Sequence, residues 1–339
     1  LPLGSPTARG KAMINLLPLK EGETISTLMP LPEDEGTWGD LNIVFATAQG
    51  KIRRNSLNDF VNVKANGKIA MKFENGNAGD RLIRVRTVTE DDDVILSTRL
   101  GKCIRFAVND LRVFTSRSST GVRGIKLTKG DDVISMSALN HVHADSESRE
   151  LYLQAVSANR RLSGADYTDK KDEKKRDTEL ADRLNDPAYQ AMAEHEEFLL
   201  TVTQDGFGKR STAYEYRITG RGGSGITSIE LKRGKKTTDV VASFPVISTD
   251  ELVMVTDGGK LIRMPVADIS QSGRTTRGVT LFKTAEDENV VSVTRIREAD
   301  TEDADADDGE VEGDGGDAKQ DSDESPDTGT DSSEGAAAE

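Results

Sequence analysis

The sequence GKCIR at 101–105 decides the fold, and it returns almost unchanged as GKLIR at 259–263. Looser copies are GKIRR at 50–54 and GFGKR at 206–210. Each copy follows an apolar, β-rich run that ends in Thr. These runs are IVFAT at 43–47, VILST at 94–98, LLTVT at 199–203 and LVMVT at 252–256. A strand, a glycine-bearing turn and a second strand predict a β-hairpin, and four copies predict a repeat architecture.

A second repeated signal lies behind each hairpin. It is a glycine followed, four residues later, by an apolar residue, any residue, and another apolar residue or Thr. These glycines are Gly10, Gly67, Gly121, Gly225 and Gly278. The alternation predicts a third strand, and an acidic turn with a fourth apolar strand comes next, at 80–85, 132–136, 239–243 and 289–293. Each unit is therefore expected to be four antiparallel strands in about 50 residues, the size of a propeller-type blade.

One interval between the repeated glycines is twice as long as the others. From 141 to 195 the chain has no strand–glycine–strand signal and is rich in Glu, Lys, Arg, Ala and Leu. We interpret this stretch as a helical insertion between blades, with helices at about 147–162 and 178–195 joined by a charged link at 169–177. Asp186 and Pro187 suit the cap and first turn of a helix that restarts there.

The chain is therefore predicted to be all-β, with about 4.5 blades. A half blade at 1–31 is followed by blades at about 40–90, 91–139, 196–248 and 249–297, which together make one domain at 1–297. The tail at 298–339 holds 18 acidic residues and one lysine, so its net charge of −17 leaves +3 for the rest of a chain whose total is −14. Such a composition predicts disorder in the tail.

The sequence offers no catalytic constellation. His141, His143 and His195 lie at the two ends of the insertion and are interpreted as surface histidines rather than metal ligands. Cys103 is expected to be a buried thiol. The glycine-rich loop at 220–225 lacks the Lys-Ser/Thr and the helix of a phosphate loop. No secretory segment and no run of 18 apolar residues occurs, so a cytoplasmic protein without metal or cofactor of its own is expected.

Positive charge, in contrast, follows the repeat. Basic residues recur in the hairpins and in the Ser/Thr-rich segments before the repeated glycines. Guanidinium groups, hydroxyls and loop amides are common phosphate ligands, so a charge repeated in every blade predicts a basic belt that binds the backbone of DNA or RNA. The alternative is ordinary solvated charge that protects sheet edges. The candidate DNA-binding residues are Lys51, Arg53, Arg54, Lys64, Lys68, Lys102, Arg105, Arg112, Arg117, Arg123, Lys209, Arg210, Arg217, Arg221, Lys260, Arg263, Arg274 and Arg277.

Several segments resemble one known family, the C-terminal domain of the bacterial DNA gyrase A protein. They are TARGKAMINLLPL at 7–19, TGVRGIKL at 120–127, QDGFGKR at 204–210 and TAEDENVV at 284–291. The resemblance covers about 3–297 apart from the insertion, and the acidic tail is similar in kind to that of many members. It implies a β-pinwheel, a propeller-like disc of six blades that share strands with their neighbours. The family's gyrase box, QRRGGKG, would precede this chain, which is expected to start within the second blade.

The resemblance also implies a function. A gyrase pinwheel wraps double-stranded DNA around its basic perimeter so that the ATP-dependent holoenzyme introduces negative supercoils. The partners implied are the remainder of the gyrase A protein and the gyrase B protein, in an A2B2 heterotetramer. ATP and Mg would act through the gyrase B protein and the cleavage core, so this chain is expected to have no catalytic site. The alternatives are the C-terminal domain of the corresponding topoisomerase IV protein and a propeller-type scaffold that binds other proteins.

Overall fold

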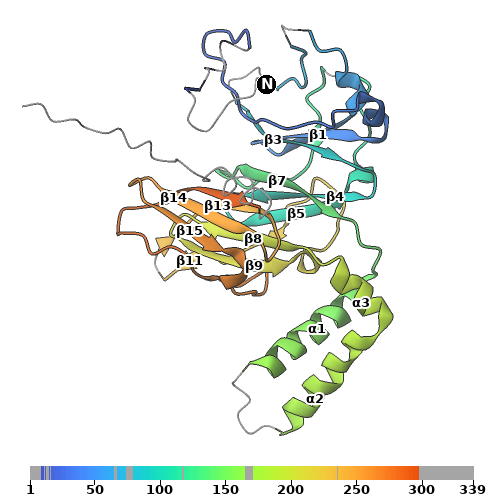
Figure 1. Ribbon diagram of the computed structural model, residues 1–339, viewed down its shortest axis with the longest axis vertical. Coiled ribbons are helices and arrows are strands. Elements are labelled where there is room, and N and C mark those ends of the chain that lie inside the picture. Colours follow the sequence, from blue (N-terminus) through green and yellow to red (C-terminus); the bar gives the residue numbers. More distant parts are fainter. Residues whose placement is uncertain are drawn as a thin grey trace, which may run out of the picture. The chain divides into compact units, whose positions relative to one another are not determined.

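The computed structural model describes residues 9–10, 12, 15, 17–64, 67–73, 79–116, 118–164, 171–234 and 236–297, with the backbone alone at 171–172. The predicted tail at 298–339, Arg117 and much of the predicted half blade lie outside the described residues. Figure 1 shows antiparallel sheets that succeed one another along the chain, with helices between the second and the third. The all-β pinwheel with a helical insertion is therefore confirmed.

Four sheets make up four blades. The first blade has the order β3-β1-β2-β6, from β1 (Asn42–Thr47), β2 (Lys51–Ser56), β3 (Leu82–Val88) and β6 (Val122–Arg123). The second has the order β10-β5-β4-β7, from β4 (Asp92–Thr98), β5 (Lys102–Ala107), β7 (Val133–Asn140) and β10 (Ile226–Thr227). The third has the order β13-β8-β9-β16, from β8 (Phe198–Thr203), β9 (Phe207–Thr212), β13 (Val240–Val246) and β16 (Val279–Thr280). The fourth has the order β15-β14-β17, from β14 (Glu251–Thr256), β15 (Leu261–Pro265) and β17 (Val290–Ile296).

The outermost strand of each of the first three blades comes from the next repeat. Val122 of β6 lies opposite Ile52 of β2, and Ile226 of β10 lies opposite Cys103 of β5. The expectation from the repeat pattern that each repeat would supply all four of its own strands is therefore wrong, whereas the sharing of strands between neighbouring blades that the gyrase resemblance implied is confirmed. These strands have only two residues each, and the apolar alternation that predicted a longer strand serves the core instead, since Ile125 and Ile229 are 2% exposed.

The repeated glycines stand where the exchanged strand meets its host. Gly121, Gly225 and Gly278 have φ of +78°, +69° and +80°, and a Cβ on any of them would lie 2.4 Å from a backbone oxygen of the preceding blade. Only glycine adopts this backbone conformation without cost, and only glycine lets the two backbones approach so closely. Strand exchange therefore explains the second repeated signal at these three glycines, whereas Gly10 and Gly67 show no such close approach.

Three apolar clusters lie between consecutive blades, and a further one lies within the first blade and the segment before it. One cluster joins the first two blades and includes Val44, Ile52, Leu96 and Phe106. A second joins Ile95 and Cys103 with the third blade, and a third joins the third and fourth blades. Both faces of the inner sheets are therefore covered, which explains why β2 and β5 are buried at four successive positions.

The fourth blade has no exchanged strand among the described residues. β15 forms its outer edge, and it shows the alternation of exposed and half-buried residues that a half-covered strand should have. A small hairpin of β11 (Lys232–Arg233) and β12 (Lys236–Thr237) was not predicted. Among the described residues up to 31, no strand is present, although the predicted half blade required two.

The insertion is helical as predicted, with different bounds. It contains α1 (Ser146–Ser163), α2 (Lys171–Ala181) and α3 (Pro187–Glu194), with a 3-10 turn at Asp182–Asn185. The side chain of Asp186 caps α3, and Pro187 occupies its first turn, as predicted. The charged link predicted at 169–177 is wrong, because 171–177 belongs to α2, where the charged residues at 173–176 are exposed and Asp177 is buried.

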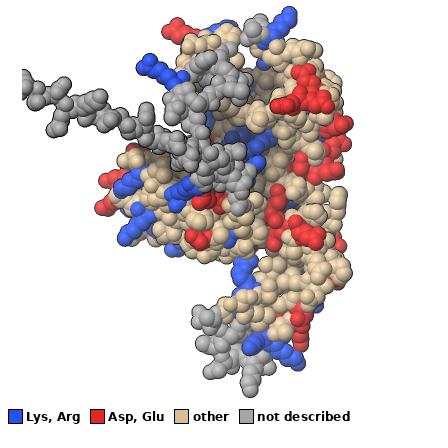
Figure 2. Space-filling model, in the orientation of Figure 1, with Lys and Arg blue, Asp and Glu red and all other residues tan. Residues whose placement is uncertain are grey.

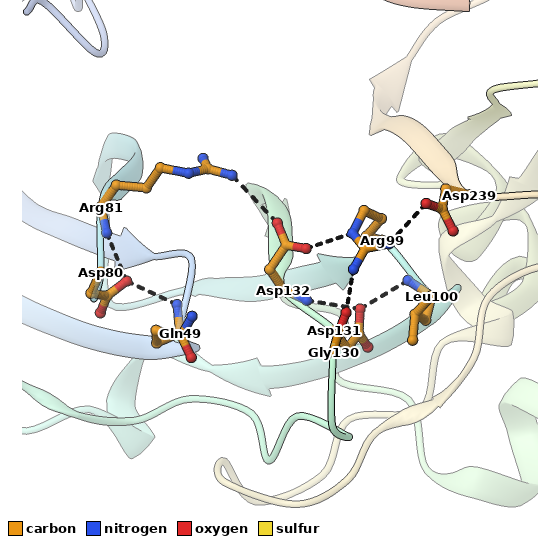
Figure 3. A network of polar contacts seen from close by, with 9 residues as sticks. All are labelled: Gln49, Asp80, Arg81, Arg99, Leu100, Gly130, Asp131, Asp132 and Asp239. Carbon is orange, nitrogen blue, oxygen red and sulfur yellow. Dashed lines mark hydrogen bonds and ion pairs between the residues drawn. The ribbon is translucent and has the colours of Figure 1, made fainter. Parts of the chain in front are cut away.

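The acidic turns before β3 and β7 fix the neighbouring hairpins of the first two blades (Figure 3). Asp80 Oδ1 accepts from the amide of Gln49 at 2.9 Å, and Asp131 Oδ1 accepts from that of Leu100 at 2.9 Å. Arg99 links two blades, because its Nε donates to Asp132 Oδ1 at 2.7 Å and its Nη1 donates to Asp239 Oδ2 at 2.8 Å. These bonds raise the pKa of Arg99 and keep it charged.

Candidate nucleic-acid interface

The arginine that ends the hairpin motif is buried in three of the four copies, where it bonds to the next blade. We call these three arginines clamps. Arg54, Arg105 and Arg210 are only 2%, 4% and 7% exposed. Each donates to backbone carbonyls in the turn that follows the second strand of the next blade. The bonds are Arg54 Nη1 to Val108 O (3.1 Å) and Leu111 O (3.2 Å), Arg105 Nη1 to Ala213 O (2.8 Å), and Arg210 Nε to Ile269 O (2.7 Å) and Nη2 to Ala267 O (3.1 Å). These three predicted DNA contacts therefore hold neighbouring blades together.

Arg263 occupies the same motif position in the last described blade. It has no following blade to clamp among the described residues, and its side chain is 52% exposed beside Glu251. Arg105, in contrast, pairs with the buried carboxylate of Asp93 at 2.8 Å, which also lies 2.7 Å from His141 Nδ1. Arg105 and Arg263 have the same motif position and lie on corresponding strands. The difference in their burial therefore comes from the following blade, which only Arg105 has among the described residues.

The residue just before this arginine in the hairpin motif is basic in two of the four copies, and it is buried in both. Arg53 and Lys209 are both fully buried. Lys209 Nζ donates to the carbonyls of Gly273 at 2.8 Å and Thr276 at 3.0 Å, and burial lowers its pKa to about 8. Arg53 donates in the same way to the carbonyl of Ser119 at 3.2 Å. Both residues hold the loop that carries the exchanged strand, so neither is open to a ligand in this conformation.

Twelve predicted residues remain at the surface, and we call them the basic belt. They lie on outer strands, in hairpin turns, or in the loops before the exchanged strands. Eight are exposed: Lys64, Arg112, Arg123, Arg217, Arg221, Lys260, Arg263 and Arg277. Four are half-buried: Lys51, Lys68, Lys102 and Arg274. Arg117, the remaining candidate, lies outside the described residues.

The loops that carry the exchanged strands are bonded to one another. The amide of Gly222 donates to the carbonyl of Gly124 at 2.6 Å, and that of Glu230 donates to Thr276 O at 3.1 Å. Arg221 Nη1 reaches Arg123 O at 3.3 Å, so side chains of the basic belt also take part. The outer edges of the first three blades thus form a continuous ribbon, and the basic belt follows it.

Figure 2 shows charge of both signs on one face of the molecule. Asp and Glu gather along the right-hand edge, whereas Lys and Arg lie side by side with Asp and Glu on the left, over the region of β14 and β15. Lys260 in this region is exposed and pairs with Glu288 at 2.5 Å.

Four arginines that we did not predict gather where the inner strands meet. Arg84 and Arg86 on β3, and Arg295 and Arg297 at the end of β17, line a cavity of about 840 Å³ between inner strands. Burial and the charges of the other three lower the pKa of Arg86. Their spacing of two residues, which places each pair on one face of a strand, was a signal available in the sequence.

Cys103 matches its prediction, whereas His141 is not the surface residue that was predicted, because it packs against the buried carboxylate of Asp93. Cys103 is buried as predicted, and burial raises its pKa to about 12. His141 is half-buried, and its ring lies 4.7 Å from that of His143. Within the described residues, no group of three or more His, Cys, Asp or Glu could hold a metal ion. No helix in the described part of the chain is both long and apolar enough to cross a membrane.

Antiparallel blades that exchange their outer strands and carry a basic outer edge define a β-pinwheel of the topoisomerase type. The sequence profile of the family described as "DNA gyrase C-terminal domain, beta-propeller" matches residues 1–32, 41–89, 92–140, 197–241 and 250–297. The chain therefore belongs to the DNA gyrase C-terminal domain family. The matched segments leave out the helical insertion.

Similar proteins agree with this assignment. The DNA gyrase A protein of Granulibacter bethesdensis is 48% identical over 317 residues, which cover 91% of this chain and 33% of that protein. The gyrase A protein of Rickettsia prowazekii is 47% identical over 88% of this chain and 32% of its own length, and that of Salmonella typhimurium is 34% identical over 91% and 28%. The chain thus spans about a third of the curated relatives it matches.

Solved structures show the same fold. The C-terminal domain of DNA topoisomerase IV superposes with a TM-score of 0.63 at 16% identity, covering 88% of this chain and 74% of that one. A DNA gyrase A C-terminal domain superposes with a TM-score of 0.53 at 23% identity, covering 82% and 76%. These likenesses do not separate the two enzymes, whereas the sequence relatives named above are gyrase A proteins and favour gyrase over topoisomerase IV.

Proposed function

We propose that this chain is the DNA-wrapping module of a gyrase A protein. Duplex DNA would follow the ribbon of exchanged strands, and the basic belt would contact its phosphates. The observation that carries the proposal is the continuity of that ribbon, since bonded outer loops present exposed arginines from one blade to the next. Phosphate contacts fix the position of a protein on DNA without reading its sequence, which is what wrapping requires.

The chemistry of strand passage would lie elsewhere. In the gyrase resemblance, breakage and rejoining belong to the rest of the gyrase A protein, and ATP and Mg act through the gyrase B protein and the cleavage core. We propose that the chain works within such an A2B2 assembly in the cytoplasm and has no cofactor of its own. Its contribution would be to bend one DNA segment so that a neighbouring segment of the same DNA molecule is presented to the cleavage core.

The proposal is tested by binding of the 339-residue chain to a duplex over a series of salt concentrations. Each phosphate contact that is neutralised contributes about −0.9 to the slope of log affinity against log salt. The variant R123Q/R277Q, which removes two exposed belt residues from exchanged loops, should therefore make the slope shallower by about 2. It should also bind several unrelated duplexes more weakly to the same extent.

The matched control is R84Q/R86Q, which removes the same charge from β3, away from the outer ribbon. We expect its salt slope to match that of the unmodified chain. Equal effects of both variants would mean that net charge, not the belt, determines binding. A flat salt dependence of the unmodified chain would favour the scaffold alternative and overturn the proposal.

A further inference from the structure

A cleft of about 1110 Å³ lies between the helical insertion and the third blade. α1 and α2 form one wall, and the end of β9 with the turn that follows it forms the other. Thr212 and Tyr214 belong to this second wall, and the loop at Gly273 closes it. Figure 1 shows the helices projecting from the segment that joins β7 to β8, next to β9. The cleft thus borders the outer edge of the molecule.

Arginine dominates the walls of this cleft. The helical insertion contributes Arg149, Arg160, Arg161, Arg176 and Arg183. The third blade side adds two residues of the basic belt, Arg217 and Arg274, whereas only three glutamates line the cleft. Positive charge is therefore in excess, and Arg217 and Arg274 belong both to the cleft and to the belt.

Several of these arginines are available to a ligand. Arg161 is engaged, because its Nε and Nη2 each donate to the carboxylate of Asp177 at 2.7 Å. The guanidinium groups of Arg149, Arg176, Arg183 and Arg217 make no hydrogen bond or ion pair with any residue that the structure describes. Burial and the charges of Arg105 and Arg217 lower the pKa of Arg149, so an anion in the cleft would relieve repulsion.

The cleft is held in place by aromatic packing. The rings of Tyr152 on α1 and Tyr214 in the third blade meet edge to face at 5.4 Å. The hydroxyl of Tyr214 donates to the carbonyl of Met192 at 2.8 Å, and that of Tyr152 donates to Glu196 at 3.0 Å. Because these residues are buried, the insertion is docked on the third blade rather than freely hinged. The arginines are therefore positioned before any ligand arrives.

We propose that the helical insertion is an additional DNA-contact wall that extends the basic belt. Its arginines would grip one sugar–phosphate strand of the duplex where that strand passes the third blade. Guanidinium groups bind phosphate in a bidentate manner, and the hydroxyls of Ser146, Ser157 and Thr212 in the same cleft are further phosphate ligands. This inference rests on the proposed function, because Arg217 and Arg274 connect the cleft to the belt.

The test compares two double variants of the 339-residue chain. R176Q/R183Q removes two cleft arginines that hold no other described side chain. K174Q/K175Q removes the same charge from exposed positions on α2, next to Arg176, that do not line the cleft. We expect the first variant to make the salt slope of duplex binding shallower by about 2. We expect the second variant to leave the slope unchanged and affinity within about twofold.

Each outcome separates the two proposals. If R123Q/R277Q weakens binding and R176Q/R183Q binds like K174Q/K175Q, the insertion proposal fails and the proposed function stands. If the unmodified chain binds no duplex, the proposed function itself fails. If R176Q/R183Q weakens binding of a polyglutamate peptide but not of DNA, the cleft is an acidic-protein site and the inference is overturned. Circular dichroism melts of both variants check that folding is unaffected.

Discussion

At the scale of single residues, burial divides the basic residues of the hairpin motif into two kinds. Arg53, Arg54, Arg105, Lys209 and Arg210 are interior, although the motif that contains them looks like a surface turn. Their donors satisfy carbonyls of loops that belong to the next blade. A buried carbonyl without a partner destabilises a fold, so these cations stabilise the contact between blades.

Removing one clamp should therefore destabilise the fold more than removing its exposed counterpart. We expect R105M to lower the free energy of unfolding by about 3–5 kcal/mol, because it leaves the buried Asp93 carboxylate without its arginine partner and with His141 alone beside it. R263M, at the same motif position, should cost only about 0–1 kcal/mol, since its pair with Glu251 is largely exposed. Urea denaturation of both variants measures this difference, and equal losses would contradict the assigned role.

Lys209 should make stability depend on pH. Its pKa of about 8 in the folded chain lies below the ordinary value of 10.5, so between these values the unfolded chain binds more protons. Stability then rises as pH increases through this range, and the gain is lost as pH falls through 8. The stability of the unmodified chain relative to K209M should therefore increase from about pH 8 to about pH 10. A constant difference would mean that the Lys209 pKa is not lowered.

The sequence could predict that charge recurs at these positions but not which way it points. In an ordinary half-exposed strand, two adjacent residues such as Arg53 and Arg54 face opposite sides, and one of them reaches solvent. Here both sides of β2 are covered, so both are buried. That covering depends on segments far away in the chain, such as the loop at Ser119 and the turn at Val108, which no local pattern records.

At the scale of elements, strand exchange is the feature that organises the repeat. The hairpins were predictable because the strand–glycine–strand pattern is local. The gyrase resemblance implied that neighbouring blades share strands, but the residue pattern could not locate the exchanged strands, because they have only two residues each and pair with the previous blade. The repeated glycine was visible in the sequence, but its reason, the close approach of two backbones, appears only in the folded chain.

Substitution of a crossing glycine should weaken the exchange. In G225A the new Cβ would lie 2.4 Å from the carbonyl oxygen of Cys103, on a backbone with φ of +69°. We expect a loss of more than about 1 kcal/mol in the free energy of unfolding, because alanine cannot adopt this conformation without strain. G220A lies in the same loop with no heavy atom within 4 Å of its Cβ, and it should change stability little. Thermal melts of the two variants measure this difference in stability. A G225A variant as stable as the unmodified chain would contradict the close approach of the two backbones at this position.

At the scale of the whole described chain, the packing of consecutive blades determines where the surface charge lies. Clamps and exchanged strands fix consecutive blades, and this brings the loops before the exchanged strands into one bonded ribbon. The helical insertion adds positive charge beside the third blade. Sequence alone predicted a charge in every blade and an insertion of helices, but not that the insertion folds against the outer edge.

The measurement that tests the central claim most directly is topological. A nicked circular duplex is ligated in the presence of increasing amounts of the 339-residue chain, the protein is removed, and the linking number is read by gel electrophoresis. If the basic belt wraps DNA with the hand implied by the gyrase resemblance, the mean linking number shifts to positive values in proportion to bound protein. Binding without any shift, or with a negative shift, would contradict the wrapping account.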